Sequence, residues 1–243
     1  MKGRFFHTLL LITLTASLVF GTLGQPTEVH AANTAATYPS AAVSTIVGSY
    51  NGAPWLTPTN AGADDSTTTN VGISALDKEP TEQLDATDFG FAIPLGSTID
   101  GIVLEYDRFS PDVGADVTDT LVQLRHAGAL VGINKAAGAG WATTETIVTF
   151  GTSSDVWGTT LTAAQINEST FGVSVVATTI TNNSQAEIDF LRITVYYTPA
   201  ADISFIPDVV FAESNKVYLV NPQSADSSVY SYGASHPVLE GRH

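Results

Sequence analysis

The sequence predicts an all-β protein, in which an antiparallel, jelly-roll-like β-sandwich is preceded by a signal peptide and followed by a short β-hairpin tail. Short runs of alternating apolar and polar residues recur about every ten residues, with Gly, Pro, Asn and Asp dense between them. The amphipathic helices that a βαβ architecture needs are not found in the sequence. Only 14% of the residues are charged, against roughly 25% in average soluble domains. Thr, Ser, Asn and Gly supply the polar character instead, a mixture that suits strands and turns better than helices.

The N-terminus has the layout of a secretory signal peptide. Lys2 and Arg4 precede an apolar run over 5–20, and small residues then lead to a V-x-A cleavage site after Ala31. The apolar run is shorter than the roughly twenty residues that a membrane-spanning helix needs. The sequence therefore predicts a signal peptide over 1–31 and a secreted, extracellular or cell-surface protein without a membrane span in the mature chain. A retained N-terminal anchor is the alternative.

The mature chain is predicted to hold one domain between two flanking segments. Residues 32–40 are small and polar and predict a flexible lead, 41–198 predict the sandwich, and 199–243 predict a strand-forming tail. The strand candidates of the sandwich are 41–50, 71–76, 88–94, 99–109, 118–125, 129–133, 144–150, 171–178 and 186–198. The one helix candidate is 162–169, where Thr162 is a suitable N-cap.

Alternation along the longer strands predicts which side chains form the core, because every second side chain of a strand lies on the same face. Phe89 and Phe91 are expected to fill the core as well, while Pro94 and Gly96 turn the chain. This stretch is therefore interpreted as scaffolding. The strand residues expected in the core are Ile102, Leu104, Tyr106, Phe171, Val173, Val175, Ala177, Leu191, Ile193, Val195 and Tyr197.

The composition excludes several classes of function. The chain has no cysteine, so disulfide frameworks, thiolate metal sites and catalytic thiols are excluded. The net charge is −15 and the chain has only nine Lys and Arg residues, which argues against a nucleic-acid partner. An acidic surface favours solubility and attracts cations.

The sequence carries no catalytic signature, and we therefore predict a non-enzyme. Neither a G-x-S-x-G nucleophile elbow, an H-E-x-x-H motif nor a Walker A motif is present. His126 would need a nucleophile and an acid that nothing in the sequence marks. Glycoside hydrolysis needs only two suitably spaced carboxylates. The chain has 24 acidic residues, and their number keeps glycoside hydrolysis as a less favoured alternative. Glu105 and Asp107 share a strand face, but two neighbouring surface acids are ordinary.

Four stretches in this order resemble β-sandwich, jelly-roll-type modules of secreted bacterial proteins and phage tail-associated proteins. They are "FGFAIPLGSTIDGIVLEY", "DTLVQLRHAG", "DVWGTTLTAAQINESTFGVSV" and "IDFLRITVYYT". The resemblance covers about residues 40–198 and consists of structural residues, so it transfers no site residue. It implies an accessory or binding module, commonly one directed at carbohydrates or at a cell surface.

Aromatic side chains predict a glycan or another cell-surface polymer as the ligand. Trp55, Trp141 and Trp157 each lie near glycine or proline in predicted loops, where their rings could stack on sugar faces. Tyr196 points away from the predicted core and is a fourth candidate. The alternative is that each Trp ring caps an open end of the sandwich.

Acidic residues predict a structural calcium ion as a second type of site, because calcium prefers oxygen ligands. Asp189 is in phase with the apolar face of its strand, and a buried carboxylate needs a cation or several donors. The loop acids have a simpler interpretation as solvated turn residues, and no EF-hand loop is present. The candidate ligands are Asp64, Asp65, Asp112, Asp116, Asp119 and Asp189.

The tail predicts a role in assembly as the alternative function. The stretches "DVVFA" and "KVYLV" are strand-like, and an isolated hairpin is marginally stable in water. The tail would dock on the sandwich, continue into a further domain, or self-associate through residues 203–232. Strand exchange of this kind would make the chain a subunit of a surface fibre or sheath. The sequence as a whole predicts a secreted, non-catalytic module for binding or assembly.

Overall fold

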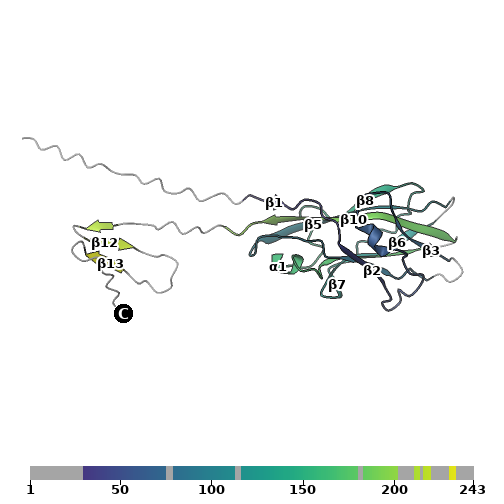
Figure 1. Ribbon diagram of the computed structural model, residues 1–243, viewed down its shortest axis with the longest axis horizontal. Helices are drawn as coiled ribbons and strands as arrows, with labels where there is room; N and C mark the ends of the chain where they lie inside the picture. The colour runs from purple at the N-terminus through teal and green to yellow at the C-terminus, as the bar shows by residue number, and fades with distance from the viewer. Residues whose placement is uncertain are drawn as a thin grey trace, which may run out of the picture. The chain divides into compact units, whose positions relative to one another are not determined.

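The computed structural model describes residues 30–74, 79–112, 116–179 and 183–201, together with the backbone of three short strands nearer the C-terminus (Figure 1). The chain divides into two compact units, of which one comprises Val29–Asp202. The other unit contains the three C-terminal strands, and the two units are described separately.

Two antiparallel five-stranded sheets form the larger unit and confirm the predicted all-β sandwich. The first, here called the β10 sheet, has the order β1-β10-β5-β8, with β3 also paired to β10. Its strands are β1 (Ala32–Asn33), β3 (Thr69–Ile73), β5 (Thr98–Phe109), β8 (Thr146–Phe150) and β10 (Ser184–Thr198). The second, the β9 sheet, has the order β2-β4-β9-β6-β7. Its strands are β2 (Ala41–Thr45), β4 (Gln83–Thr87), β6 (Thr118–His126), β7 (Ala129–Val131) and β9 (Gly172–Thr178).

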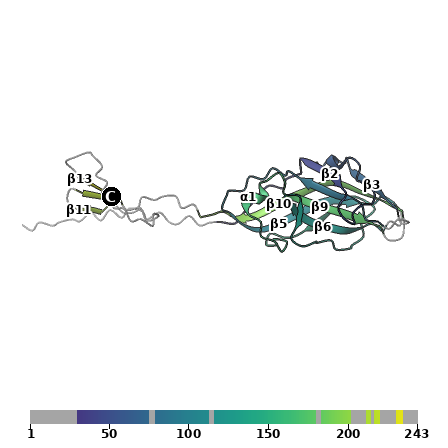
Figure 2. The same cartoon turned by 90° about the horizontal axis from the view of Figure 1, so that it is seen from below.

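The core lies between the two sheets, whose strands are seen from a second direction in Figure 2. The alternation along β5, β9 and β10 holds: the predicted core residues are buried, apart from Tyr197, which is partly buried against the core. The two helical segments are short. They are the 3-10 turn η1 (Pro58–Ala61) and the helix α1 (Ala163–Ile166), and Thr162 caps α1 in a capping box with Gln165.

The segment 88–94 was expected to be a strand, and this expectation is wrong. Asp88 and Gly90 have positive φ angles of 59° and 69°, which a strand does not allow. Phe89 and Phe91 nevertheless stack on each other, with ring centroids 5.9 Å apart, and both are buried. The strand of this region is β4, which was not predicted because only Leu84 and Ala86 provide its apolar face.

Residues 32–40 were expected to be a flexible lead, but they pair along one edge of β10. β1 pairs with the end of β10, and Thr37 and Ile193 exchange backbone hydrogen bonds of 2.9 and 3.0 Å. β3 pairs with the beginning of β10, and Gly62 forms a bridge to Phe190 between them. β10 is 15 residues long, so this edge would otherwise present many unpaired backbone groups.

A buried ion pair lies inside the core next to β5 and β6. Asp119 accepts hydrogen bonds from the Tyr106 hydroxyl (2.6 Å) and Trp141 Nε1 (3.1 Å), and its other oxygen contacts Arg108 Nη1. The Arg108 guanidinium also lies over both rings, 5.4 Å from the Tyr106 centroid and 5.2 Å from that of Trp141. Burial lowers the pKa of Arg108 and raises that of Tyr106 well above its usual range. Each polar group of this cluster therefore depends on the others.

The C-terminal unit contains a small antiparallel sheet of order β11-β12-β13. Its strands are β11 (Phe211–Glu213), β12 (Lys216–Leu219) and β13 (Tyr230–Gly233). Most of the remaining tail, and nearly all of the predicted signal peptide over 1–31, lie outside the described residues. Self-association through 203–232 stays a prediction. Within the described part of the chain, no helix has the length and apolar character required to cross a membrane.

Candidate functional site

A row of polar side chains crosses the face of the β9 sheet that points away from the core. Val43, Asp85, Ser174 and Gln123 lie directly opposite one another on β2, β4, β9 and β6. Apart from Ser44 on β2, the residues on either side of them in each strand, such as Leu84, belong to the core. Strand alternation therefore puts this row on the outer face. We call Gln83, Asp85, Gln123, Arg125 and Ser174 the polar row.

Hydrogen bonds connect the members of the polar row. Asp85 Oδ1 accepts from Ser174 Oγ at 2.7 Å and from Gln83 Nε2 at 2.6 Å, and Asp85 Oδ2 forms an ion pair with Arg125 Nη1. Gln123 Nε2 donates to the Gly132 carbonyl at 2.7 Å. These bonds hold amide, carboxylate and guanidinium groups in fixed positions on three neighbouring strands.

Arg125 reaches across the sheet because Gly172 leaves the space above β9 open. Arg125 and Gly172 are opposite each other in register, and the guanidinium contacts Asp85 on the strand beyond. A Cβ atom at Gly172 would lie 1.9 Å from the Ala86 carbonyl oxygen. Gly172 is thus required by this close approach, and burial lowers the pKa of Arg125.

The polar row retains hydrogen-bonding capacity. Among the described residues, Gln83 Oε1 and Arg125 Nε have no hydrogen-bond partner. Gln83, Asp85 and Ser174 are buried, whereas 13% of the Arg125 side chain is exposed and Val43 is 55% exposed. Gln83 Oε1 and Arg125 Nε are both buried, so the row can form further hydrogen bonds with a ligand only where its side chains rearrange.

The three tryptophans do not offer the exposed rings that the sequence suggested. Trp55, Trp141 and Trp157 are 2%, 6% and 0% exposed. Their Nε1 atoms donate to the Glu82 carbonyl (3.0 Å), Asp119 (3.1 Å) and the Ile102 carbonyl (2.8 Å). A ring can stack on a sugar only if one of its faces is open to solvent. The three rings are buried, and this corrects the prediction that they bind a glycan by stacking. It favours the alternative in which the rings fill the sandwich.

Tyr196 and His126 were also singled out from the sequence, and neither belongs to the polar row. Tyr196 is half-buried on β10, in register with Gly101 of β5, and thus belongs to the other sheet. His126 Nε2 lies 2.9 Å from Glu168 Oε2 at the end of β6. This contact with Glu168 gives the His126 ring a hydrogen-bond partner.

The predicted acidic ligands fall into two groups in the structure. Asp112 accepts a hydrogen bond from the Gln185 amide at 2.7 Å, and Asp116 accepts one from the Thr179 hydroxyl. Asp119 accepts a hydrogen bond from the Tyr106 hydroxyl inside the core. These three residues have different hydrogen-bond partners, and their role as calcium ligands stays a prediction. Asp64 and Asp65, by contrast, both lie close enough to Asp189 to raise its pKa, although burial is the largest cause of that rise. Sequence reasoning did not add Asp107 and Glu145 to them, because their proximity depends on the pairing of β5 with β8 and β10.

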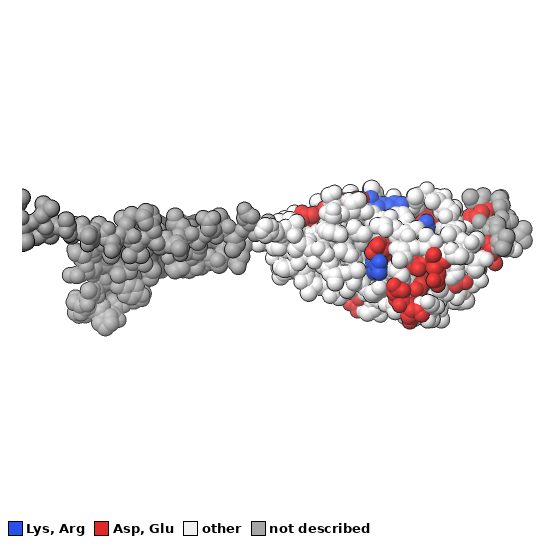
Figure 3. All heavy atoms as spheres, turned by 90° about the horizontal axis from the view of Figure 1, so that it is seen from above, with Lys and Arg blue, Asp and Glu red and all other residues white. Residues whose placement is uncertain are grey.

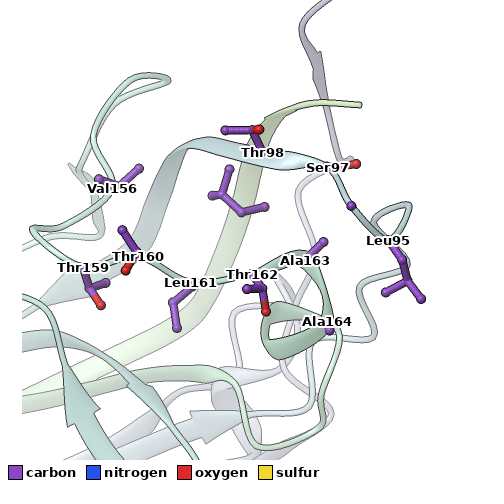
Figure 4. Close-up of a pocket in the computed structure, with 12 residues that line it drawn as sticks. Leu95, Ser97, Thr98, Val156, Thr159, Thr160, Leu161, Thr162, Ala163 and Ala164 are labelled. Carbon is purple, nitrogen blue, oxygen red and sulfur yellow. The ribbon is translucent and has the colours of Figure 1, made fainter. Parts of the chain in front are cut away.

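A pocket of about 670 Å³ lies between the segment that leads into β5 and the segment that leads into α1 (Figure 4). Aliphatic side chains and threonines line it, and Leu95 at its edge is 73% exposed. The lining contains neither a charged residue nor an aromatic ring. Its residues are Leu95, Gly96, Ser97, Thr98, Ile99, Val156, Thr159, Thr160, Leu161, Thr162, Ala163 and Ala164. This chemistry suits a small apolar group better than a polar ligand.

No family model matches the sequence, and no curated protein matches it. The chain is similar to a solved structure described as "CBM4 structure and function", with 14% identity, coverage of 63% of this chain and 91% of that one, and a TM-score of 0.36. It is also similar to the N-terminal cellulose-binding domain of Cellulomonas fimi β-1,4-glucanase C, with 13% identity, coverage of 69% and 95%, and a TM-score of 0.33. A crystal structure with xylogluco-oligosaccharide has 17% identity, coverage of 69% and 35%, and a TM-score of 0.27. Values this low do not assign the chain to a family.

Proposed function

We propose that the chain is a non-catalytic carbohydrate-binding module that holds a glycan against the outer face of the β9 sheet. The polar row supports this proposal. Sugar hydroxyls both donate and accept hydrogen bonds, and planar amide, carboxylate and guanidinium groups can bind two neighbouring hydroxyls at once. Arg125 supplies the guanidinium and Asp85 the carboxylate, and the two form an ion pair with each other. Gln83 adds an amide whose oxygen has no hydrogen-bond partner among the described residues.

The dimensions of the polar row fit a short stretch of a polymer. Together with the exposed Val43 beside it on β2, the row extends across four strands as far as Gln123 on β6. At the usual strand spacing this distance is roughly 15 Å. An extended oligosaccharide lying across the strands would contact several members of the row at once. Gln123 and Arg125 are the partly exposed members of the row, and ligand entry requires Arg125 to change its side-chain position.

The charge of the polar row favours a neutral glycan. Asp85 and Arg125 neutralise each other, so the row offers no surplus charge to an ionic ligand. The chain as a whole has a net charge of −15, which disfavours the approach of an acidic polymer. The proposed ligand class is therefore a neutral, hydroxyl-rich polysaccharide.

Affinity electrophoresis in native gels tests this ligand class. We expect the chain to migrate more slowly in gels that contain a neutral soluble glucan or xylan than in gels without polymer. Gels with an acidic polysaccharide at the same concentration should leave its mobility unchanged. Retardation in the acidic polymer alone, or in none of a broad panel of neutral ones, would refute the proposal.

A further inference from the structure

Asp107 and Asp189 face each other at a β-bulge between β5 and β10. Ile188 pairs with Arg108 and Leu191 pairs with Tyr106, so two residues of β10 stand opposite the single residue Asp107. Bulges of this kind re-aim a side chain. The bulge interrupts the alternation that put Asp189 in phase with the apolar residues of its strand, and it leaves two carboxylates side by side.

Both carboxylates are buried, and each has an oxygen without a partner. Asp107 is 8% and Asp189 is 2% exposed. The Thr146 amide donates to Asp107, and the Ser66 and Asp65 amides donate to Asp189. Within the described residues, the Oδ1 atom of each carboxylate still lacks a hydrogen-bond partner. A buried carboxylate oxygen without a partner is costly, so two of them at one place require a compensating donor or cation.

The surroundings add negative charge. Every charged neighbour that shifts the pKa of either carboxyl group is acidic. These neighbours are Glu145, Asp189 and Asp64 for Asp107, and Asp64 and Asp65 for Asp189. Burial is the larger cause, and both causes raise the pKa of the two carboxyl groups. Figure 3 shows acidic side chains gathered together on one face of the domain, with a smaller basic patch next to them.

We propose that Asp107 and Asp189 are the central ligands of a calcium site that joins the 62–66 loop to the β10 sheet. Calcium takes six to eight oxygen ligands in flexible geometry, including backbone carbonyls and water. The loop already contacts β10 through the Gly62–Phe190 bridge and through its amides to Asp189. Asp64 and Asp65 are exposed on this loop and can turn toward the ion.

The donor set selects calcium among the common cations. The chain has no cysteine, and the residues that converge here offer oxygen ligands only, which argues against zinc. Among the described residues, no three carboxylate, imidazole or thiolate groups already form a metal-binding group. Magnesium needs rigid octahedral geometry, whereas calcium tolerates a site that a loop completes on binding. The ion would have a structural role, because Asp107 and Asp189 belong to the sheet opposite the polar row.

Thermal unfolding of the purified chain, with calcium and with chelator, tests the site. At a calcium concentration about 100 times its dissociation constant, we expect a melting temperature about 5–10 °C higher than in EDTA. Asp189→Asn and Asp107→Asn should each lose this calcium-dependent rise. In EDTA both variants should melt no lower than the native chain, because the amide removes the repulsion between the carboxylates. Isothermal titration should give a stoichiometry of one.

Asp112→Asn is the matched control, because Asp112 is an exposed loop acid on the same chain with its own backbone partner. It should keep the full response to calcium. The proposal is overturned if calcium leaves the native chain unchanged, if the two central variants respond like the native chain, or if only Asp112→Asn loses the response. An equal rise with magnesium at the same concentration would overturn the choice of calcium.

Discussion

Replacing Asp119 with alanine is expected to destabilise the domain by about 3–5 kcal/mol, the usual cost of leaving one member of a buried ion pair without its partner. Arg108 would keep its charge inside the core, between the rings of Tyr106 and Trp141. The Tyr106 hydroxyl and Trp141 Nε1 would also lose their acceptor. Urea unfolding followed by Trp fluorescence measures the loss, because Trp141 lies in the cluster.

Asp112→Ala provides the comparison for this effect. Asp112 is exposed and accepts one hydrogen bond, from the Gln185 amide, so its removal should cost about 1 kcal/mol or less. A double variant, Asp119→Ala with Arg108→Met, should recover part of the lost stability because it removes the unpaired charge. If Asp119→Ala costs no more than Asp112→Ala, the described core network does not stabilise the fold.

Replacing Arg125 with alanine should weaken glycan binding by about 10- to 100-fold, which corresponds to the roughly 1.5–3 kcal/mol of a hydrogen bond to a charged group. Arg125 contributes the guanidinium of the polar row and its part-exposed side chain. Arg125→Lys should retain only part of the affinity, since an ammonium group cannot form the planar, two-pronged contact. Isothermal titration with the polysaccharide identified by electrophoresis measures both effects.

Arg192→Ala is the matched control for Arg125→Ala. Arg192 pairs with Glu105 at 3.0 Å on the outer face of the other sheet, and its side chain is 24% exposed. The proposal predicts native affinity for this variant. Removing Arg125 also leaves Asp85 without its ion-pair partner, so circular dichroism must first establish that the variant is folded. Equal losses for both variants would indicate a general effect of charge or stability and would contradict the assigned face.

The long strands were predictable from the sequence, whereas contacts across strands were not. β5 and β10 have enough alternating residues to define their buried faces, and the predicted bounds of β5, 99–109, differ by one residue from the observed strand. β4 has only two core residues, and the neighbouring Phe89 and Phe91 have the spacing of a strand without its backbone angles. Period-two spacing therefore identified buried side chains more reliably than it identified strands.

The two proposed sites differ in how much of them the sequence contained. Asp189 was selected because an acid in phase with apolar residues needs compensation, and Asp64 and Asp65 were selected as acids of a long loop. Asp107 joins them only through the bulge of β10. The polar row was missed entirely. Its members recur at every second position of β4 and β6, yet their alignment depends on strand register, which a single sequence does not specify. The exposure of the three tryptophans was predicted wrongly, because glycine and proline around a residue indicate a loop but do not indicate that its side chain is exposed.

Chemical-shift mapping with a neutral oligosaccharide tests the central claim most directly. On addition of the ligand to the ¹⁵N-labelled chain, we expect the largest changes at the side-chain amides of Gln83 and Gln123 and at Arg125 Nε, with smaller changes along β4, β6 and β9. This result would place the carbohydrate-binding face at the polar row. Changes confined to the pocket between Leu95 and Ala164, or to the face that carries Asp107 and Asp189, would contradict the account.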